Sequence, residues 1–451
     1  MAEKMTERKP LDHQEISMKL KTLEEFQRLH GVKQLGFLCD VYGKDITHTR
    51  LSYSIKLFQK AEQIVQQLKK NQPELNITDQ DVMCVALAGL CYNLGQPPLS
   101  YDFWGIRSRK TGFFNEDELW RESCKLLDNI WPNIIQMDIW NCNKVELSME
   151  DKAFVKALMR GKEKNLKELD GYPLRHEGKD FLYEIVNNKY NGLDVKLFTY
   201  LIEDATNLRI EDWSSTFAEI EEMTKTAKVT FVNEFGVDTT RSHIAYSEKF
   251  RHLIVQLFQK KEYLHRTVYQ NPEHRANVIW LSDAYKRNDE EVAAHKFSTL
   301  TDEKFLSLLH VPSVEQKSKQ RKYKLAAQVS IPVKKEKLSQ LKKELANIRH
   351  CVNDTIQVDV IDYSDAYVPE RVRGKTKATK RISVTCDSMR LSTTHTQNVP
   401  YDGMRILKLD LEIRMMGKLS CGIRNCWKKN VTVLAASNFS VMRFIQRVVY
   451  G

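Results

Sequence analysis

Apolar residues recur every three or four positions along most of the first 308 residues, which is the spacing of one face of an amphipathic helix. The helices predicted from this spacing cover residues 16–30, 54–70, 116–130, 150–169, 180–208, 213–228, 245–268, 275–287 and 302–308. The larger part of the chain is therefore predicted to be a helical domain.

One further helix is marked by its first residues. Thr78 precedes Asp81 by three positions, as in a capping box, and almost wholly apolar sequence follows in VMCVALAGLC. A helix that is apolar on all sides must be covered by other elements, so we expect this one deep in the core.

After about residue 310 the pattern changes to alternation. The segments TIQVDVIDY (355–363) and RILKLDLEIR (405–414) alternate apolar and charged residues, which is typical of half-exposed strands. Two segments are basic, KSKQRKYK (317–324) and VRGKTKATKR (372–381), and the second is predicted to be a flexible loop between strands. The predicted fold is mainly α, with a disordered N-terminus (1–15), a helical domain (16–310) and a smaller C-terminal α+β lobe (311–451).

Composition narrows the compartment and the partners. The 451 residues are 42% hydrophobic, yet no run of 18 apolar residues occurs and the N-terminal sequence lacks the apolar stretch of a signal peptide. We therefore expect an intracellular protein without a membrane partner. Its nine cysteines lack the paired spacings of zinc sites, so reduced thiols are expected. The formal charge of +11 favours phosphate-bearing partners, although a solvated surface explains it equally well.

Five stretches together resemble one enzyme family. They are FQRLHGVKQLG (26–36), HTRLSYS (48–54), QPELNITDQDVMCVALAGLCYNLG (72–95), FLYEIVNNKYNGLDV (181–195) and YLHRTVYQ (263–270). The family is that of the SAM-and-HD-domain deoxynucleoside triphosphate triphosphohydrolases, and the match runs from residue 16 to about 370. It implies an HD-type helical core over 16–310, and an activity that cleaves dNTPs to deoxynucleoside and triphosphate with a divalent metal such as Zn, Fe, Mn or Mg. Because residues 1–15 leave no room for the family's SAM domain, we expect a member without it.

The same resemblance indicates that the metal ligands are replaced. The family's first histidine position is Tyr53, its His-Asp pair is Tyr92-Asn93, and its distant aspartate aligns with Lys196. A phenol is a poor ligand near neutral pH, an amide oxygen is neutral, and an ammonium repels a cation. We therefore expect no catalytic residue, metal or other cofactor at these positions, and a pseudoenzyme that acts by binding. Tyr53 and Tyr92 would be core aromatics, and Lys196 would either pair with Asp194 or stand where the metal stood.

The nucleotide-binding positions of the family are kept in part. At the phosphate end Arg50 matches, but Gln96 and Tyr101 replace two histidines and Lys261 replaces an arginine. The positions around the deoxyribose match as a set: Gln34, Leu35, Tyr200, Asp204, His265 and Tyr269. The resemblance therefore implies a nucleoside-shaped pocket that lacks its catalytic groups.

Two other functions stay open from the sequence. An active, dGTPase-like enzyme of dNTP catabolism would need an unusual metal site, for example from His48, Asp194 and Asp204. A single-stranded nucleic-acid-binding protein would use the basic segments 317–324 and 372–381. The predicted partners are a dNTP or nucleoside, single-stranded nucleic acid, and a homo-oligomer or hetero-oligomer with an active relative. The predicted location is the nucleus, the cytoplasm or both, because the family is typically nuclear.

Overall fold

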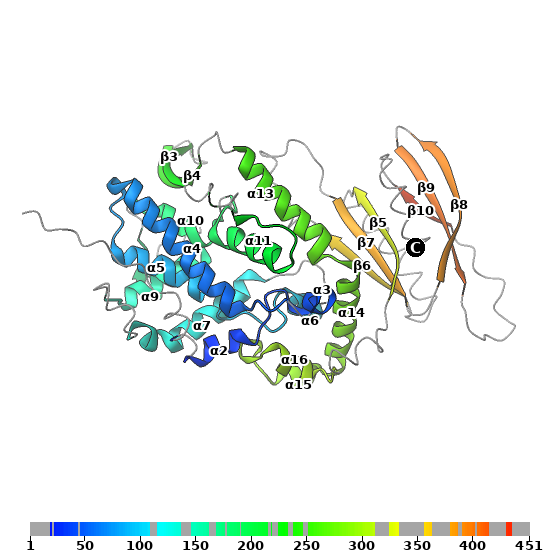
Figure 1. Ribbon diagram of the computed structural model, residues 1–451, viewed down its shortest axis with the longest axis horizontal. Coiled ribbons are helices and arrows are strands. Elements are labelled where there is room, and N and C mark those ends of the chain that lie inside the picture. Colours follow the sequence, from blue (N-terminus) through cyan, green and yellow to red (C-terminus); the bar gives the residue numbers. More distant parts are fainter. Residues whose placement is uncertain are drawn as a thin grey trace, which may run out of the picture. The chain divides into compact units, whose positions relative to one another are not determined.

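The computed structural model describes the greater part of residues 22–311 and the backbone of six strands beyond them (Figure 1). The described residues are 19, 22–43, 46–108, 115–136, 146–161, 168–175, 178–189, 191–214, 218, 224–232, 238–246, 251–311, 324–332, 356–362, 379–386, 390–401, 404–414 and 430–434. They divide into two compact units, the first Met1–Trp104, Phe114–Leu264 and Arg287–Val311, the second Gly105–Phe113, His265–Lys286 and Pro312–Gly451. The predicted disordered segment 1–15 lies outside the described residues.

The first unit is built mainly from helices. They are α2 (Glu24–His30), α3 (Cys39–Tyr42), α4 (Arg50–Asn71), α5 (Asp79–Cys91), α7 (Glu116–Ile135), α9 (Met149–Arg160), α10 (Tyr183–Val186), α11 (Val195–Asn207), α13 (Arg251–Tyr263), α15 (Asp289–Ala293) and α16 (Asp302–Leu308). Short 3-10 turns add η1 (Gly36–Leu38), η2 (Pro73–Leu75), η3 (Asp180–Leu182) and η6 (Phe297–Thr299). Helices α6 (Tyr101–Ser108) and α14 (Pro272–Arg287) and the π-helix η5 (Leu264–Tyr269) have residues in the second unit. The predicted mainly α fold is confirmed.

Helix α5 lies at the centre of the first unit. Its start is the predicted capping box, because Thr78 Oγ1 accepts from the Asp81 amide at 3.1 Å and Asp81 Oδ2 accepts from the Thr78 amide at 2.9 Å. From Asp81 to Cys91 every residue is buried, as its apolar sequence predicts. Helix α4 packs closely beside it, since a Cβ on Gly89 would lie 2.8 Å from the Leu57 carbonyl oxygen. These two helices carry several residues of the candidate site.

Two predicted helices are shorter than their periodicity suggests. The segment predicted as 180–208 is divided into α10 and α11, because Asp194 caps α11 and its carboxylate accepts from the amides of Leu197 (2.9 Å) and Asn188 (3.0 Å). The segment predicted as 16–30 becomes continuous helix only at Glu24, since Leu23 has extended backbone. Local backbone conformation at Leu23 and side-chain capping at Asp194 therefore override the apolar repeat.

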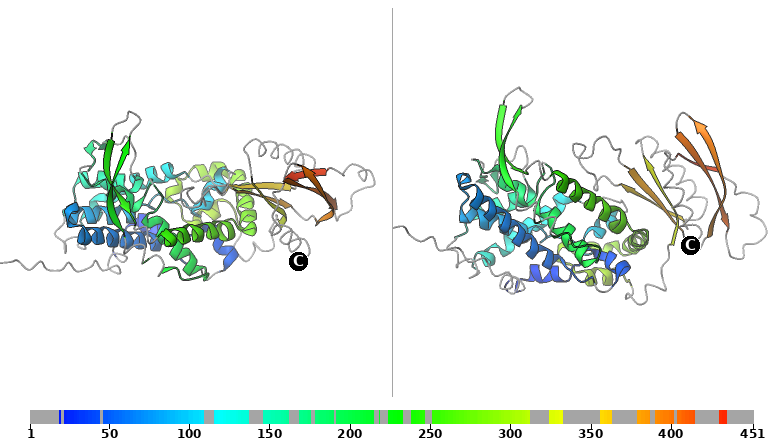
Figure 2. Two further views of the ribbon diagram at one scale, coloured as in Figure 1. Left: turned by 90° about the horizontal axis from the view of Figure 1, so that it is seen from above. Right: turned by 45° about the horizontal axis from the view of Figure 1, so that its top comes forward.

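Two other predicted helices run into strands. Helix α9 ends at Arg160, and the tail of the predicted 150–169 helix forms β1 (Glu168–Leu169), paired with β2 (Tyr172–Pro173). The prediction for 213–228 is wrong at its end, where Lys225 begins β3 (Lys225–Val232), which pairs antiparallel with β4 (Asp238–Ala245). The β-branched residues in KTAKVTFV favour a strand there. One end of the hairpin contacts the helical core, since Ile244 is buried and the Thr226 amide donates to Gln72 Oε1 at 2.7 Å, and the other end projects from the helices in both views of Figure 2.

The second unit contains two antiparallel sheets of three strands. Their orders are β5 (Lys324–Pro332), β7 (Thr379–Cys386), β6 (Ile356–Asp362), and β10 (Asn430–Leu434), β9 (Met404–Arg414), β8 (Arg390–Tyr401). The strands predicted at 355–363 and 405–414 are confirmed as β6 and β9. The predicted basic loop 372–381 is corrected at its end, because its last three residues belong to β7. The rest of that loop, and 317–323, lie outside the described residues.

No helix in the described part of the chain is both long enough and apolar enough to span a membrane.

Candidate functional site

Lys196, in the first turn of α11, joins side chains from distant parts of the first unit. Its Nζ donates to Asn187 Oδ1 at 2.8 Å and to the Tyr92 hydroxyl at 3.1 Å. A third hydrogen bond, of 3.3 Å, goes to Glu116 Oε1 on the first turn of α7. The predicted partner Asp194 is farther away, with 3.9 Å between Nζ and Oδ2. The ammonium is therefore held by three closer acceptors.

Two tyrosine hydroxyls surround the same lysine. The Tyr53 hydroxyl donates to the Lys196 carbonyl at 3.1 Å, and the Tyr92 hydroxyl donates to Glu116 Oε1 at 3.0 Å. The Tyr92 ring centroid lies 4.6 Å from Lys196 Nζ, which is a cation–π contact. Burial raises the pKa of both phenols well above the ordinary value. Both are therefore protonated donors at neutral pH and not phenolate ligands.

The residues at these positions do not fit the divalent metal that the family resemblance implies. Lys196 brings a positive charge, and Asn93 offers only a neutral amide oxygen. In the part of the chain that the structure describes, no three His, Cys, Asp or Glu side chains are grouped to hold a metal. The alternative ligands are also engaged elsewhere, because His48 Nε2 contacts Asp204 Oδ1 at 2.9 Å and Asp194 caps α11.

Arg50 is buried next to this cluster with neutral partners only. Its Nε donates to Ser100 Oγ at 2.9 Å, and Nη1 donates to Asn93 Oδ1 at 3.4 Å. Its Nη2 donates to the Gln34 carbonyl, also at 3.4 Å. Among the described residues, no side-chain carboxylate contacts this guanidinium. Arg50 is 1% exposed. A buried cation without an opposite charge is costly, so the guanidinium is suited to receive an anion.

Further hydrogen-bonding capacity is found in the segments that carry Arg50 and its partners. Of the buried side-chain atoms without a hydrogen-bond partner among the described residues, four belong to these segments: Gln34 Oε1, His48 Nδ1, Asn93 Nδ2 and Gln96 Nε2. Backbone hydrogen bonds link these residues in pairs. The backbone amide of Gln34 donates to the backbone carbonyl of His48, and that of Gln96 donates to the backbone carbonyl of Asn93. The ring of Tyr101, which is largely exposed, covers the guanidinium at 5.1 Å. Buried polar atoms normally have partners, so this region can recognise a polar ligand.

The other predicted nucleotide-binding residues are distributed as follows. Leu35 is buried beside Gln34, and Tyr200 on α11 packs partly buried against the core. Lys261 lies partly buried on α13. His265 and Tyr269 belong to the second unit, where their rings meet edge to face at 5.0 Å. Their role in nucleotide binding stays a prediction.

Sequence reasoning missed Glu116, Asn187 and Lys189, which complete the surroundings of Lys196. Glu116 Oε1 accepts from Asn187 Nδ2 at 3.1 Å, and Lys189 Nζ donates to Glu116 Oε2. The only local signal was the start of α7, where Asn115 Oδ1 caps the Glu118 amide at 3.0 Å. That signal predicts a helix end and does not point to a partner 80 residues away in the chain.

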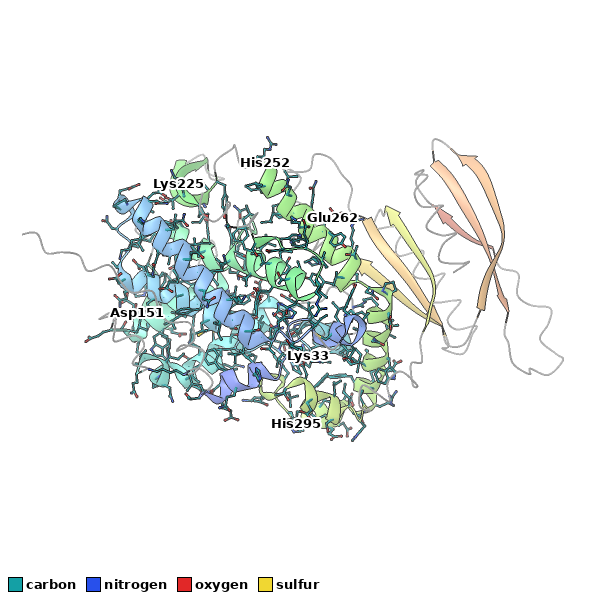
Figure 3. The ribbon with its side chains drawn as sticks, viewed as in Figure 1. Lys33, Asp151, Lys225, His252, Glu262 and His295 are labelled. Atoms are coloured by element: carbon teal, nitrogen blue, oxygen red, sulfur yellow. The ribbon has the colours of Figure 1, made fainter. Side chains whose placement is uncertain are left out.

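A buried carboxylate, Asp302, holds the loop after the Tyr92-Asn93 pair. Leu99 and Ser100 both have left-handed backbone, with φ of 56° and 55°, which is unfavourable for residues other than glycine. Asp302 Oδ1 accepts from the Leu99 amide at 2.6 Å, and Oδ2 accepts from the Lys33 amide at 2.9 Å. Lys33 is labelled in Figure 3. Burial raises the pKa of Asp302 to about 6.

We expect this carboxyl to make stability fall as the pH rises from about 4 to about 6. The folded state binds the Asp302 proton more tightly than the unfolded state, so the contribution is present at low pH and is lost as the pH passes the folded pKa of about 6. The shift corresponds to roughly 3 kcal/mol. Urea unfolding from pH 4 to 7.5 would compare the natural protein with Asp302→Asn. As the pH rises, the free energy of unfolding of the natural protein should fall relative to that of Asp302→Asn. A difference between the two proteins that stays constant with pH would contradict this.

Comparison with known proteins agrees with the resemblance seen in the sequence. No protein-family model matches the chain. The chain is 30% identical over 315 residues to the deoxynucleoside triphosphate triphosphohydrolase SAMHD1 of Gallus gallus, covering 63% of this chain and 48% of that protein. The Bos taurus protein of the same name is 29% identical over 318 residues (65% and 51%). A putative HD domain-containing protein, L394, of Acanthamoeba polyphaga mimivirus is 25% identical over 282 residues (60% and 54%). The chain spans about half the length of these relatives.

Proposed function

We propose that this chain, a divergent relative of the HD-domain deoxynucleoside triphosphate triphosphohydrolases, is catalytically degenerate and acts by binding a phosphate-bearing nucleotide. The observation that carries the proposal is the position of Lys196. Hydrolysis in this family would require a metal cation and its ligands at this position. The position instead holds a positive charge, the Lys196 ammonium, and hydrogen-bond donors from two protonated phenols and the Asn187 amide.

Arg50 supports a role in binding. A guanidinium without a carboxylate partner can form paired hydrogen bonds with a phosphate, and it already lies between two aromatic rings, Tyr53 at 5.7 Å and Tyr101 at 5.1 Å. The unpartnered Gln34 and His48 atoms offer an acceptor and a ring nitrogen for ligand hydroxyls. These groups favour a nucleotide over a plain anion as the ligand.

The first test is turnover. We expect the purified protein to release no deoxynucleoside or triphosphate from any of the four dNTPs with Mg, Mn or Fe, as followed by chromatography. A matched variant with Tyr53→His, Tyr92→His, Asn93→Asp and Lys196→Asp asks whether the scaffold supports catalysis once the ligand types are restored. Hydrolysis by the natural protein above the level of a control preparation without the protein would refute the proposal.

The second test is binding without metal. Isothermal titration with a dNTP in EDTA should show an affinity that Arg50→Met lowers about 10- to 100-fold, because charge-assisted hydrogen bonds contribute about 1.5–3 kcal/mol. Arg50→Lys keeps the charge but loses the paired geometry, so it should retain part of the affinity. Arg121→Met, at an exposed arginine on α7, is the control and should bind as the natural protein does. Equal affinity for all four proteins would refute a role for Arg50.

Nucleic-acid binding and mixed oligomers stay predictions. The basic segments on which nucleic-acid binding depends lie almost entirely outside the described residues. Binding of single-stranded nucleic acid through surface charge would weaken steeply as the salt concentration rises. A salt series therefore tests this second ligand.

A further inference from the structure

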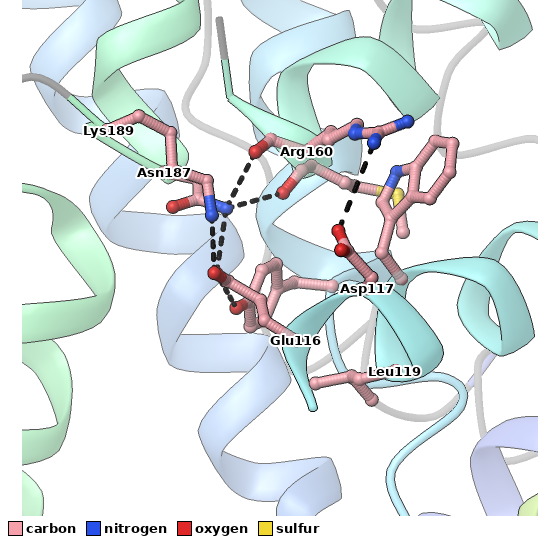
Figure 4. A pocket seen from close by; sticks show the side chains of 9 residues that line it. Glu116, Asp117, Leu119, Arg160, Asn187 and Lys189 are labelled. Carbon is pink, nitrogen blue, oxygen red and sulfur yellow. Dashed lines mark hydrogen bonds and ion pairs between the residues drawn. The ribbon is translucent and has the colours of Figure 1, made fainter. Parts of the chain in front are cut away.

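The Glu116 carboxylate lies in a ring of donors from other parts of the chain. Its Oε1 accepts from Tyr92 (3.0 Å) and Asn187 Nδ2 (3.1 Å). The same oxygen accepts from Lys196 Nζ at 3.3 Å, and Oε2 accepts from Lys189 Nζ. Figure 4 shows the carboxylate facing Asn187 across the pocket. We call the four donor side chains, Tyr92, Asn187, Lys189 and Lys196, the Glu116 cradle.

We propose that the Glu116 cradle is an oxyanion-binding site, and that Glu116 is an internal plug that a phosphate group displaces. The donors do not depend on the first turn of α7, which carries the plug, because the contact of α7 with Tyr92 comes from its next turn, where Ser123 Oγ donates to the Tyr92 carbonyl at 3.0 Å. Asn187 is fixed separately, because its Nδ2 also donates to the carbonyls of Met159 and Arg160, each at 3.0 Å. Movement of the first turn of α7 therefore leaves the donors in place.

The charge of the cradle favours an anion. Two ammonium groups, those of Lys189 and Lys196, face Glu116, and the Asp194 carboxylate lies 3.9 Å from Lys196 Nζ. Burial of this carboxyl raises its pKa, but the charge of Lys196 and the hydrogen bond from Lys189 outweigh burial and lower the pKa of Glu116 to about 2. The cradle therefore stabilises negative charge at the position of Glu116, and a phosphate group has more acceptor oxygens for its donors than one carboxylate has.

A pocket gives access to the plug. It has about 260 Å³ of empty space, including space open to solvent, and its wall contains Leu119, Trp120 and Met159 beside Glu116. Arg160 and Asp117 add an ion pair to the wall, with 3.9 Å between Nη2 and Oδ1, and the Arg160 guanidinium lies 4.4 Å from the Trp120 ring centroid. The Glu116 side chain is 33% exposed, so an anion entering the pocket reaches it directly.

The proposal goes beyond nucleotide binding at Arg50, and its test uses inorganic phosphate as the probe. Phosphate is titrated calorimetrically at pH 7.5 with ionic strength held constant by chloride. Glu116→Gln removes the charge of the plug with little change of shape, so it should bind phosphate at least about 10-fold more tightly than the natural protein. Glu118→Gln makes the same charge change on the first turn of α7 outside the pocket lining, and should change the affinity less than about 2-fold.

A second pair of variants protects the test against folding defects. Lys189→Met alters an exposed cradle donor and should abolish phosphate binding both in the natural background and together with Glu116→Gln. A parallel titration of Glu116→Gln with acetate distinguishes a phosphate site from a general carboxylate site, and we expect acetate to bind more weakly than phosphate; equal or tighter binding of acetate would contradict a phosphate site. The proposal is overturned if Glu116→Gln binds phosphate no more tightly, if Glu118→Gln gains as much, or if Lys189→Met leaves binding intact. Each of these outcomes is independent of the Arg50 titration with dNTP.

Discussion

Replacement of Arg175 by methionine is expected to lower the free energy of unfolding by about 3–5 kcal/mol, because it removes the cation from two buried carboxylates. Arg175 Nη1 donates to Asp81 Oδ1 at 2.9 Å, and Nη2 donates to Asp151 Oδ1. Asp81 and Asp151 are 1% and 0% exposed, at the N-termini of the core helices α5 and α9. The remaining cation, Lys179, reaches only Asp81, at 2.6 Å. Asp151 therefore loses its only charged partner among the described residues.

Urea unfolding measures this loss, with Lys69→Met as the matched control. Lys69 pairs with Asp79 at 2.8 Å, but both side chains are more than a third exposed, so this variant should lose less than about 1 kcal/mol. A loss below about 1 kcal/mol for Arg175→Met would contradict the importance of the cluster. The pH gives a second check. Burial opposes ionisation, but hydrogen bonds and nearby cations outweigh it and lower the pKa of both aspartates. Their contribution is therefore present above about pH 4 and is lost as the pH falls through the folded pKa values.

Lys196→Met is the second substitution with a large expected effect, a loss of about 2–4 kcal/mol. The change removes the hydrogen-bond partner of Asn187 Oδ1 and leaves the buried Asp194 carboxylate without its nearby cation. Burial already raises the pKa of Asp194 despite Lys196, so loss of the ammonium should raise it further. Glu116 keeps Lys189, which limits the loss.

Thermal and urea unfolding should show this loss, and Lys56→Met is the control. Lys56 pairs with Glu203 at 2.7 Å on the surface and is 48% exposed, so its removal should cost less than about 1 kcal/mol. If Lys196→Met were as stable as the control, Lys196 would not be a structural cation, and the proposed replacement of a metal by donors would lose its support.

Much of the fold was predictable from local pattern. The box at Thr78 and the apolar helix after it place the centre of the core, and alternation identifies β6 and β9. The error at 180–208 has a local cause, since the Asp194 side chain starts a new helix within the segment predicted as one. A cap that depends on one side-chain hydrogen bond is invisible to a count of apolar positions.

The candidate site was predictable only where a relative supplied the positions. The resemblance to the triphosphohydrolases is confirmed, and it led to Tyr53, Tyr92 and Lys196, which the structure brings together. Glu116 and Asn187 lack any such signal. They meet Lys196 through tertiary contacts from two other segments, and no spacing in the sequence indicates that a carboxylate and an amide would complete the group.

The Asp302 contact has a consequence for the protein while it is being synthesised. The residues that the carboxylate joins, Leu99 and Asp302, are 203 positions apart. At about 5–20 residues per second, the ribosome needs roughly 10–40 s to add that stretch. During this interval the nascent chain carries the Leu99 and Lys33 amides without their acceptor, and the left-handed turn has the contacts of Ser100 with Lys33 and Arg50, but not the Asp302 carboxylate, to hold it. We expect the loop behind the Tyr92-Asn93 pair to be among the last parts of the first unit to settle, and the part that a chaperone or protease meets first.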